Sequence, residues 1–336
     1  MIDVSHLWNV IHGNEQLKSR LISDIMASRL SHAYVIEGPK HSGKLMLART
    51  IASAMCDSIQ DVKKISVGAS PDVIEIDLPE KKKSIGVDKV REMKLAAYIK
   101  PNDLDFKCFI IRHADTLTVQ AQNAFLLTLE EPPAYVLFFL LCESAAQLLE
   151  TIRSRAPTLH TEPIDIHVMD QYLTKNLPEA RELKSVNPSE FAEILTTADG
   201  KLGIAIELLN PTARKPIMER RETAKKFVRL CSERKNAATT LRYISSLGQK
   251  RDLLTDQLST ILLCLRDLLI CKQTEEPPLG FFASTEEAHN LAYQFTTPEL
   301  LSLCNAINEA IDRLLMNANV RLTMTSLAVN TGLLQI

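Results

Sequence analysis

The sequence of 336 residues lacks strong net charge, long apolar runs and a leader-like start. Its formal net charge is only −2, so the whole molecule exerts no strong electrostatic attraction on nucleic acid, which leaves room for a local basic surface. No apolar run approaches the roughly 18 residues that cross a bilayer. The first residues also lack the basic and apolar stretches of a signal peptide. We therefore expect a cytoplasmic protein with no membrane partner.

Paired cysteine motifs are missing as well. The seven cysteines are odd in number, form no CxxC pair, and in several cases lie inside apolar runs. This pattern favours reduced cysteines in a hydrophobic core over a disulfide framework or a zinc site, so we expect no bound metal. The positions are Cys56, Cys108, Cys142, Cys231, Cys264, Cys271 and Cys304.

Short β-rich runs alternate with helical patterns in the first half of the sequence. The predicted strands cover residues 33–37, 72–76, 108–112, 136–141 and 158–161. The predicted helices cover residues 14–28, 43–56, 87–99, 119–129 and 145–153. Strands that are apolar along their whole length are typical of a parallel sheet covered on both faces. The alternation therefore predicts an α/β domain with helices on both faces of the sheet.

The pattern after residue 162 is helical. Residues 163–209 predict three or four short helices, and Pro211 and Pro216 predict a hinge after them. Longer amphipathic helices follow in residues 217–336, including 253–271, 298–317 and 322–334. We therefore expect three domains: an α/β domain at 1–162, a small helical lid at 163–210 and a C-terminal helical domain at 211–336.

The sharpest motif is GPKHSGK at residues 38–44, which fits the phosphate-binding pattern GxxxxGK. It directly follows a predicted strand and precedes a predicted helix. In that order, backbone N–H groups and the helix N-terminus can surround a phosphate, while a lysine neutralises its charge. We predict a P-loop fold, with Gly38, Gly43 and Lys44 as the nucleotide-binding candidates.

Side chains that hold magnesium are missing around this loop. Leu45 stands where a P-loop has Ser or Thr, and leucine offers no oxygen to a hard cation. Two acids should follow the strand at 108–112, but Arg112 and His113 occupy those positions and Asp115 comes later. Metal-dependent phosphoryl transfer depends on this electrostatic support. We expect no intrinsic ATPase activity and no required cofactor, and leave open whether the loop binds ATP or phosphate.

Three further motifs lie between residues 115 and 156. They are AQNA at 121–124, TLEEPP at 128–133 and TIRSR at 151–155. Together with Trp8, HAY at 32–34 and NANVRL at 317–322, they resemble the clamp-loader branch of the AAA+ proteins over nearly the whole chain. The resemblance implies a P-loop AAA+ module with a parallel sheet, then a small helical lid and a C-terminal all-α collar domain.

The sequence departs from that family at several positions. Many relatives carry four zinc-binding cysteines after the P-loop helix, and only Cys56 is present here, so no zinc is expected. Ala156 replaces the cysteine of the family's SRC motif, and Leu127 replaces a usual lysine. Cys142 and Gly203 stand where active subunits place a polar sensor and a sensor arginine. The last two changes again remove side chains that contact ATP.

The resemblance implies a role for Arg155, with Ser154 in the same motif. Arg155 would be an arginine finger that reaches the γ-phosphate of ATP held by an adjacent motor subunit. A guanidinium suits this role because it is always charged and its planar fork can bind two phosphate oxygens. The alternative is a surface arginine that pairs with a nearby carboxylate, a role for which Arg153 is a good candidate.

By the same resemblance, the chain is a non-catalytic part of the bacterial DNA polymerase III holoenzyme. Its partners would be the gamma or tau and delta subunits and, through the complex, the sliding clamp and primer–template DNA. Arg91 is the candidate contact to DNA phosphates, while the run at residues 81–83 is interpreted as a solvated loop. The alternatives are an ATP-hydrolysing gamma/tau-type subunit with an unusual metal site, and a regulatory AAA+ protein unrelated to replication.

Overall fold

A computed structural model describes residues 4–78, 82, 84–232, 243–244, 247, 250–277, 279–316 and 318–330. The chain forms two compact units. One comprises Met1–Met169 with Gly200–Gly203, and the other comprises Asp170–Asp199 with Ile204–Ile336. The predicted domain boundaries at residues 162 and 210 stay predictions. Within the described residues, no helix is both long and apolar enough to span a membrane.

The first unit is built on five parallel strands in the order β2-β3-β4-β1-β5. All five predicted strands are confirmed, with each end within one residue of its predicted position. They are β1 Ala33–Glu37, β2 Val73–Ile76, β3 Lys107–Ile111, β4 Val136–Cys142 and β5 Thr158–His160. Because β1 lies between β4 and β5, the loop that follows β1 emerges at the sheet's carboxyl edge, one strand in from the edge strand β5.

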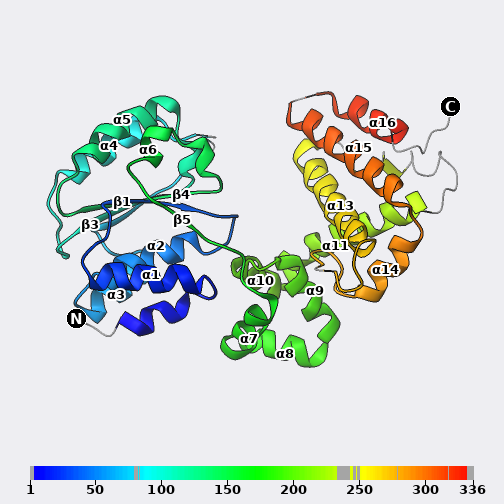
Figure 1. Cartoon of the computed structure of the whole chain (residues 1–336), viewed down its shortest axis with the longest axis horizontal. Coiled ribbons are helices and arrows are strands. Elements are labelled where there is room, and N and C mark those ends of the chain that lie inside the picture. The colour runs from blue at the N-terminus through cyan, green and yellow to red at the C-terminus, as the bar shows by residue number, and fades with distance from the viewer. Residues whose placement is uncertain are drawn as a thin grey trace. The chain divides into compact units, whose positions relative to one another are not determined.

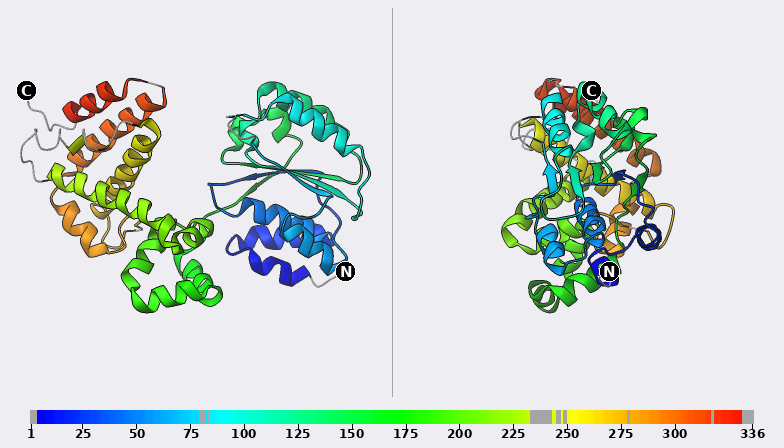
Figure 2. Two further views of the ribbon diagram at one scale, coloured as in Figure 1. Left: turned by 180° about the vertical axis from the view of Figure 1, so that it is seen from behind. Right: turned by 90° about the vertical axis from the view of Figure 1, so that its left-hand side faces the viewer.

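Helices cover both faces of this sheet (Figure 1), and Figure 2 shows the same layers from behind. One layer contains η1 Val4–Val10, α1 Glu15–Met26, α2 Lys44–Ala54 and α3 Ile59–Ser66. The other contains α4 Val87–Ala97, α5 Val119–Glu130 and α6 Glu150–Arg153, with the short turns η2 Ala114–Thr116 and η3 Ala145–Gln147.

Side chains of β4 alternate between two hydrophobic cores, which explains why this strand is apolar throughout. Phe138 and Leu140 pack in the core beneath α4 and α5, whereas Leu137 and Phe139 pack in the core beneath α1 and α2. Each of these side chains is at most 4% exposed. Burial on both faces is the physical origin of the continuous apolar run that predicted the strand.

One predicted helix of this unit is wrong in its extent. Residues 145–153 form two short helical segments, η3 and α6, because Leu148 and Leu149 between them are extended, with ψ of 144° and 142°. The backbone N–H of Leu149 donates to the side chain of Gln122 at 2.7 Å, rather than to a carbonyl within a continuous helix. A side-chain acceptor on α5 thus breaks the helix at this point.

Helices make up the rest of the described chain. Four short ones, α7 Ile166–Asn176, α8 Pro178–Val186, α9 Pro188–Ala198 and α10 Leu202–Leu209, agree with the predicted three or four. Longer helices follow: α11 Pro211–Ser232, α13 Arg251–Cys271, α14 Thr285–Tyr293, α15 Thr297–Leu315 and α16 Val320–Asn330. The predicted helix ends at 317 and 331–334 lie outside the described residues. Helix α13 contacts α11, α14 and α15, and so forms the centre of this core.

The predicted hinge at Pro211 and Pro216 is wrong, because α11 runs through both residues. Pro211 is the first residue of the helix, where its missing N–H has no intrahelical partner to lose. Pro216 deprives only the carbonyl of Thr212 of a hydrogen bond. Both Thr212 and Pro216 are exposed, so water can bond to that carbonyl.

Candidate functional site: a phosphate loop and a surface arginine

The loop between β1 and α2 needs glycine at two positions for different reasons. At Gly38, an added Cβ would lie 2.1 Å from Oγ1 of Thr161 and 2.7 Å from its carbonyl oxygen, so no side chain fits. Gly43 has φ of 84° and ψ of 13° as the residue before α2, a left-handed conformation that favours glycine. The hydroxyls of Ser42 and Thr161 lie 2.8 Å apart and tie the loop to the end of β5.

Lys44 directs its charge into the loop itself. Its Nζ donates to the carbonyl oxygens of Gly38 and Pro39, each at 2.6 Å. Partial burial lowers the pKa of the Lys44 ammonium, and the nearby carboxylates of Glu143 and Asp115 act in the opposite direction. The lysine expected from the sequence is therefore in place at the loop, and its contacts in this structure are to the backbone.

The residues around the loop do not fit the magnesium site of a P-loop ATPase. Leu45 packs against the core beneath α1 and α2. Arg112, at the end of β3, pairs with Asp77 at 2.6 Å, so a cation occupies the position expected for an acid. Asp115 accepts the backbone N–H of Glu143 at 3.0 Å. Among the described residues, no group of three or more His, Cys, Asp or Glu side chains could hold a metal ion.

The two sensor positions also lack polar side chains that could reach a nucleotide. Cys142, at the end of β4, is 1% exposed, and burial raises the pKa of its thiol to about 12. Gly203 lies against the phosphate loop, since a Cβ added there would be 3.4 Å from Cβ of His41. The resemblance places a sensor arginine at this point, and the chain supplies only backbone.

Arg155 lies at the surface, just after α6. Its NH1 donates to the carbonyl oxygen of Thr151 at 2.9 Å, and its NH2 lies 2.7 Å from Oε1 of Glu130. The side chains of Arg155 and Glu130 are 36% and 45% exposed. Ser154 donates its hydroxyl to the same Thr151 carbonyl at 3.1 Å. In the described part of the chain, the surface pair expected for Arg153 is formed by Arg155 instead.

The position of α6 depends on Gln122, which sequence reasoning used only as part of a motif. Gln122 is 3% exposed on α5. Its amide donates to the carbonyl oxygen of Leu117 at 3.1 Å, and its side-chain oxygen accepts the N–H of Leu149 at 2.7 Å. Ile152 and Ala156, both 0% exposed, hold the other side of α6 in the core. The sequence offered one sign of this role, a glutamine beside the buried face of a predicted helix.

Arg91, the candidate DNA contact, lies on the exposed face of α4. It pairs with Asp88 at 3.4 Å, while Lys89 pairs with Glu92 at 2.9 Å. These exposed pairs reduce the net positive charge of the helix surface. Residues 81 and 83 of the basic run lie outside the described residues, and Lys82 is exposed. The assignment of Arg91 to DNA binding stays a prediction.

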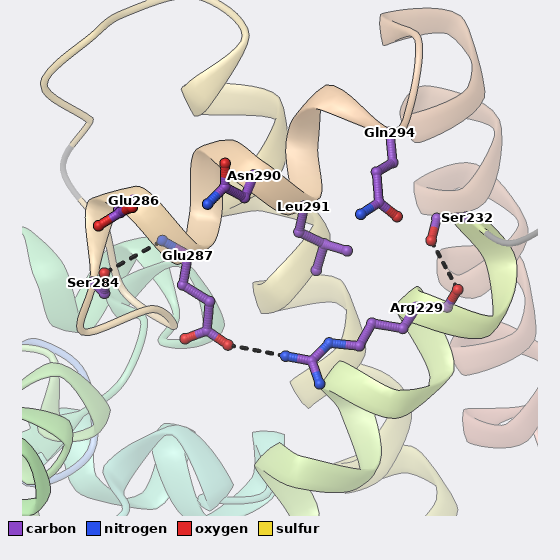
Figure 3. A pocket seen from close by; sticks show the side chains of 8 residues that line it. All are labelled: Arg229, Ser232, Ser284, Glu286, Glu287, Asn290, Leu291 and Gln294. Carbon is purple, nitrogen blue, oxygen red and sulfur yellow. Dashed lines mark hydrogen bonds and ion pairs between the residues drawn. The ribbon is translucent and has the colours of Figure 1, made fainter.

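A separate hollow of about 470 Å³ lies between α11 and α14 (Figure 3). Two of its charged side chains bond to each other, because Arg229 pairs with Glu287 at 3.3 Å. Ser284 accepts the N–H of Glu287, and Ser232 donates to the carbonyl of Arg229. Arg229 and Glu287 therefore neutralise each other in the hollow, whose lining also includes Glu286.

The first unit has the fold of a P-loop AAA+ module, with a phosphate loop between β1 and α2 of a parallel sheet in the order β2-β3-β4-β1-β5. A family profile described as "DNA polymerase III, delta subunit" matches residues 13–165. The delta' subunit of DNA polymerase III from Bacillus subtilis is 28% identical over 326 residues, covering 92% of this chain and 93% of the relative. In sequence the chain is thus similar to subunits of DNA polymerase III, and over nearly its full length to the delta' subunit.

Two other similarities cover different lengths. The tau subunit of DNA polymerase III from Bacillus subtilis is 29% identical over 208 residues, which is 59% of this chain but only 36% of the tau subunit. A DNA polymerase III gamma subunit-related protein from Thermotoga maritima aligns over 93% of this chain and 98% of its own, with 19% identity and a TM-score of 0.47.

Proposed function

We propose that the chain is a delta prime subunit: a non-catalytic clamp-loader component that completes the ATP site of a neighbouring motor subunit through Arg155. The observation that carries this proposal is a phosphate loop without magnesium ligands, with Leu45 packed against the core and Arg112 paired with Asp77. The similarity to a delta' subunit over nearly the full length of both chains supports it.

Arg155 suits a role in trans because its guanidinium is accessible and only part of it is engaged by groups of its own chain. Its partner Glu130 is about half exposed, and an ion pair of this kind contributes about 0–1 kcal/mol. The pair therefore adds little to folding stability, and the N–H donors of Arg155 outside it can bind a γ-phosphate. Fingers supplied in trans accelerate GTPases by about 10³–10⁵-fold, which sets the upper range of the effect expected here.

The proposed partners are the gamma or tau and delta subunits of the same complex, acting in the bacterial cytoplasm. Through them the chain would support ATP-dependent loading of the sliding clamp onto primed DNA. Arg91 is the proposed contact to DNA phosphates, a contact that would depend on salt and not on base sequence. The chain itself would need no cofactor, whether or not its phosphate loop binds ATP passively.

A second candidate is an ATP-hydrolysing subunit of the gamma/tau type with an unusual metal site. The identity of 29% with a tau subunit and the retained Lys44 favour it. The contacts of Asp115 weigh against it, because this carboxylate already accepts the N–H of Glu143. ATP turnover by the purified chain separates the two candidates.

Reconstitution of the complex with motor and delta subunits tests the proposed role of Arg155. Arg155→Ala should leave the complex assembled, as judged by gel filtration, and slow clamp- and DNA-dependent ATP turnover at the completed site by about tenfold or more. Arg153→Ala, two residues earlier on the same surface, is the matched control and should retain the wild-type rate. An unchanged rate with Arg155→Ala would show that this residue is not the finger.

A further inference from the structure

Arg155 is held from two directions by residues from different helices. NH1 bonds to the carbonyl of Thr151 in α6, and NH2 bonds to the carboxylate of Glu130, the last residue of α5. A weaker contact of 3.4 Å joins NH1 to Oγ of Ser154. These contacts, which come from both α5 and α6, together set the direction in which the guanidinium points.

The groups that hold Arg155 stand on rigid supports. Glu130 follows Thr128 and Leu129, which are 0% and 1% exposed, so the end of α5 is fixed to the core. Thr151 precedes Ile152, which is 0% exposed. An arginine without such contacts distributes over many rotamers, and selecting one of them has an entropic cost.

The three contacts leave part of the guanidinium free for a ligand. Arginine has five N–H donors, and the contacts to Thr151, Ser154 and Glu130 engage at most three of them, so at least two donors remain. Because the Arg155–Glu130 pair is exposed, its contribution to folding is small. The main effect of the Arg155–Glu130 pair is instead to orient the Arg155 side chain.

We propose that Glu130 is a positioning residue for the arginine finger, which fixes the direction of Arg155 before the neighbouring subunit binds. This inference rests on the proposed function of Arg155. In the complex, Glu130 retains one edge of the guanidinium while the remaining donors face the γ-phosphate of the neighbour's ATP. The opposite role, a brake that withholds Arg155 from the phosphate, predicts the opposite sign for loss of the carboxylate.

The test uses the reconstituted complex with four variants of this chain: Glu130→Ala, Arg155→Ala, the double variant, and Glu131→Ala as control. Glu131 is the next residue and is also exposed. Ordering one long side chain corresponds to a factor of about 2–10 in a rate constant. Glu130→Ala should therefore lower kcat for the Arg155-dependent part of ATP turnover by about 2–10-fold and leave KM for ATP unchanged. Glu131→Ala should match wild type.

Non-additivity identifies the route of the effect. If Glu130 acts through Arg155, the double variant should turn over ATP at the rate of Arg155→Ala alone. A rate with Glu130→Ala that equals or exceeds wild type would overturn the positioning role, as would additive losses in the double variant. These results leave the finger intact as long as Arg155→Ala itself slows turnover. If Arg155→Ala has no effect on ATP turnover, Arg155 is not the finger, and the proposed function and the positioning role of Glu130 are both wrong.

Discussion

Replacement of Gln122 by methionine should destabilise the first unit and misplace Arg155, although Gln122 is remote from any exposed surface. Methionine has a similar length and fills the same space, so the change removes hydrogen bonds with little change in packing. The wild-type amide bonds to the carbonyl of Leu117 at 3.1 Å and to the N–H of Leu149 at 2.7 Å. A third contact, at 3.4 Å to the carbonyl of Gln147, is long enough to discount.

The magnitude follows from the two shorter bonds. Each bond contributes about 0.5–1.5 kcal/mol to the free energy of unfolding. A buried backbone group that is left without a hydrogen-bond partner costs about 1–3 kcal/mol. Leu117 is 5% exposed, so water does not readily replace the lost donor. We expect Gln122→Met to cost about 2–4 kcal/mol.

Trp8 provides a selective readout, because it is the single tryptophan of the chain and is 4% exposed in the core of the first unit. Its fluorescence during urea unfolding reports this unit even if the rest of the chain unfolds separately. Gln120→Met is the matched control, since it makes the same substitution at an exposed position of α5. In the reconstituted complex, Gln122→Met should also slow ATP turnover. Equal unfolding midpoints for the two variants would refute the reasoning.

Three further predictions concern the loop, the sheet edge and the surface of α4. Gly38→Ala should destabilise the first unit by about 2 kcal/mol or more because its Cβ would overlap Thr161, whereas Gly43→Ala should cost only about 1–2 kcal/mol for its left-handed backbone; urea unfolding compares the two. Burial raises the pKa of the Cys142 thiol from its ordinary value of 9.0 to about 12, so its contribution to stability is present below pH 9 and is lost as the pH rises toward 12. Iodoacetamide at pH 8 should therefore modify Cys142 only after denaturation, and modification of the native chain would contradict its burial. Arg91→Ala should reduce DNA binding by the complex and lower the slope of log K for DNA against log salt concentration by about 1. An unchanged slope would show that Arg91 does not contact DNA.

Local signals in the sequence predicted the sheet and the phosphate loop. Five apolar runs located the strands, and the GxxxxGK spacing placed Gly38 and Gly43 between β1 and α2 and Lys44 at the start of α2. The wrong prediction of a hinge at Pro216 also has a local cause. Proline near the start of a helix costs one hydrogen bond at an exposed carbonyl, and the rule for proline in helix interiors overstates that cost.

Contacts between distant residues could not be predicted in this way. Arg155 pairs with Glu130, 25 residues away, and Gln122 bonds to Leu149, 27 residues away. Both contacts depend on how α5 packs against α6, which hydrophobic periodicity does not specify. The sequence indicated that Arg112 would not support a metal, and the structure adds its ion pair with Asp77 beyond the neighbouring strand β2.

The central claim is that this phosphate loop, with Leu45 packed against the core and Arg112 at the end of β3, does not support ATP hydrolysis. ATP turnover by the isolated, purified chain with Mg²⁺ tests the claim most directly, with a motor subunit measured alongside. The account predicts a rate at background, and full turnover only when the motor subunit is present. A rate for the isolated chain comparable to that of the motor subunit would contradict it.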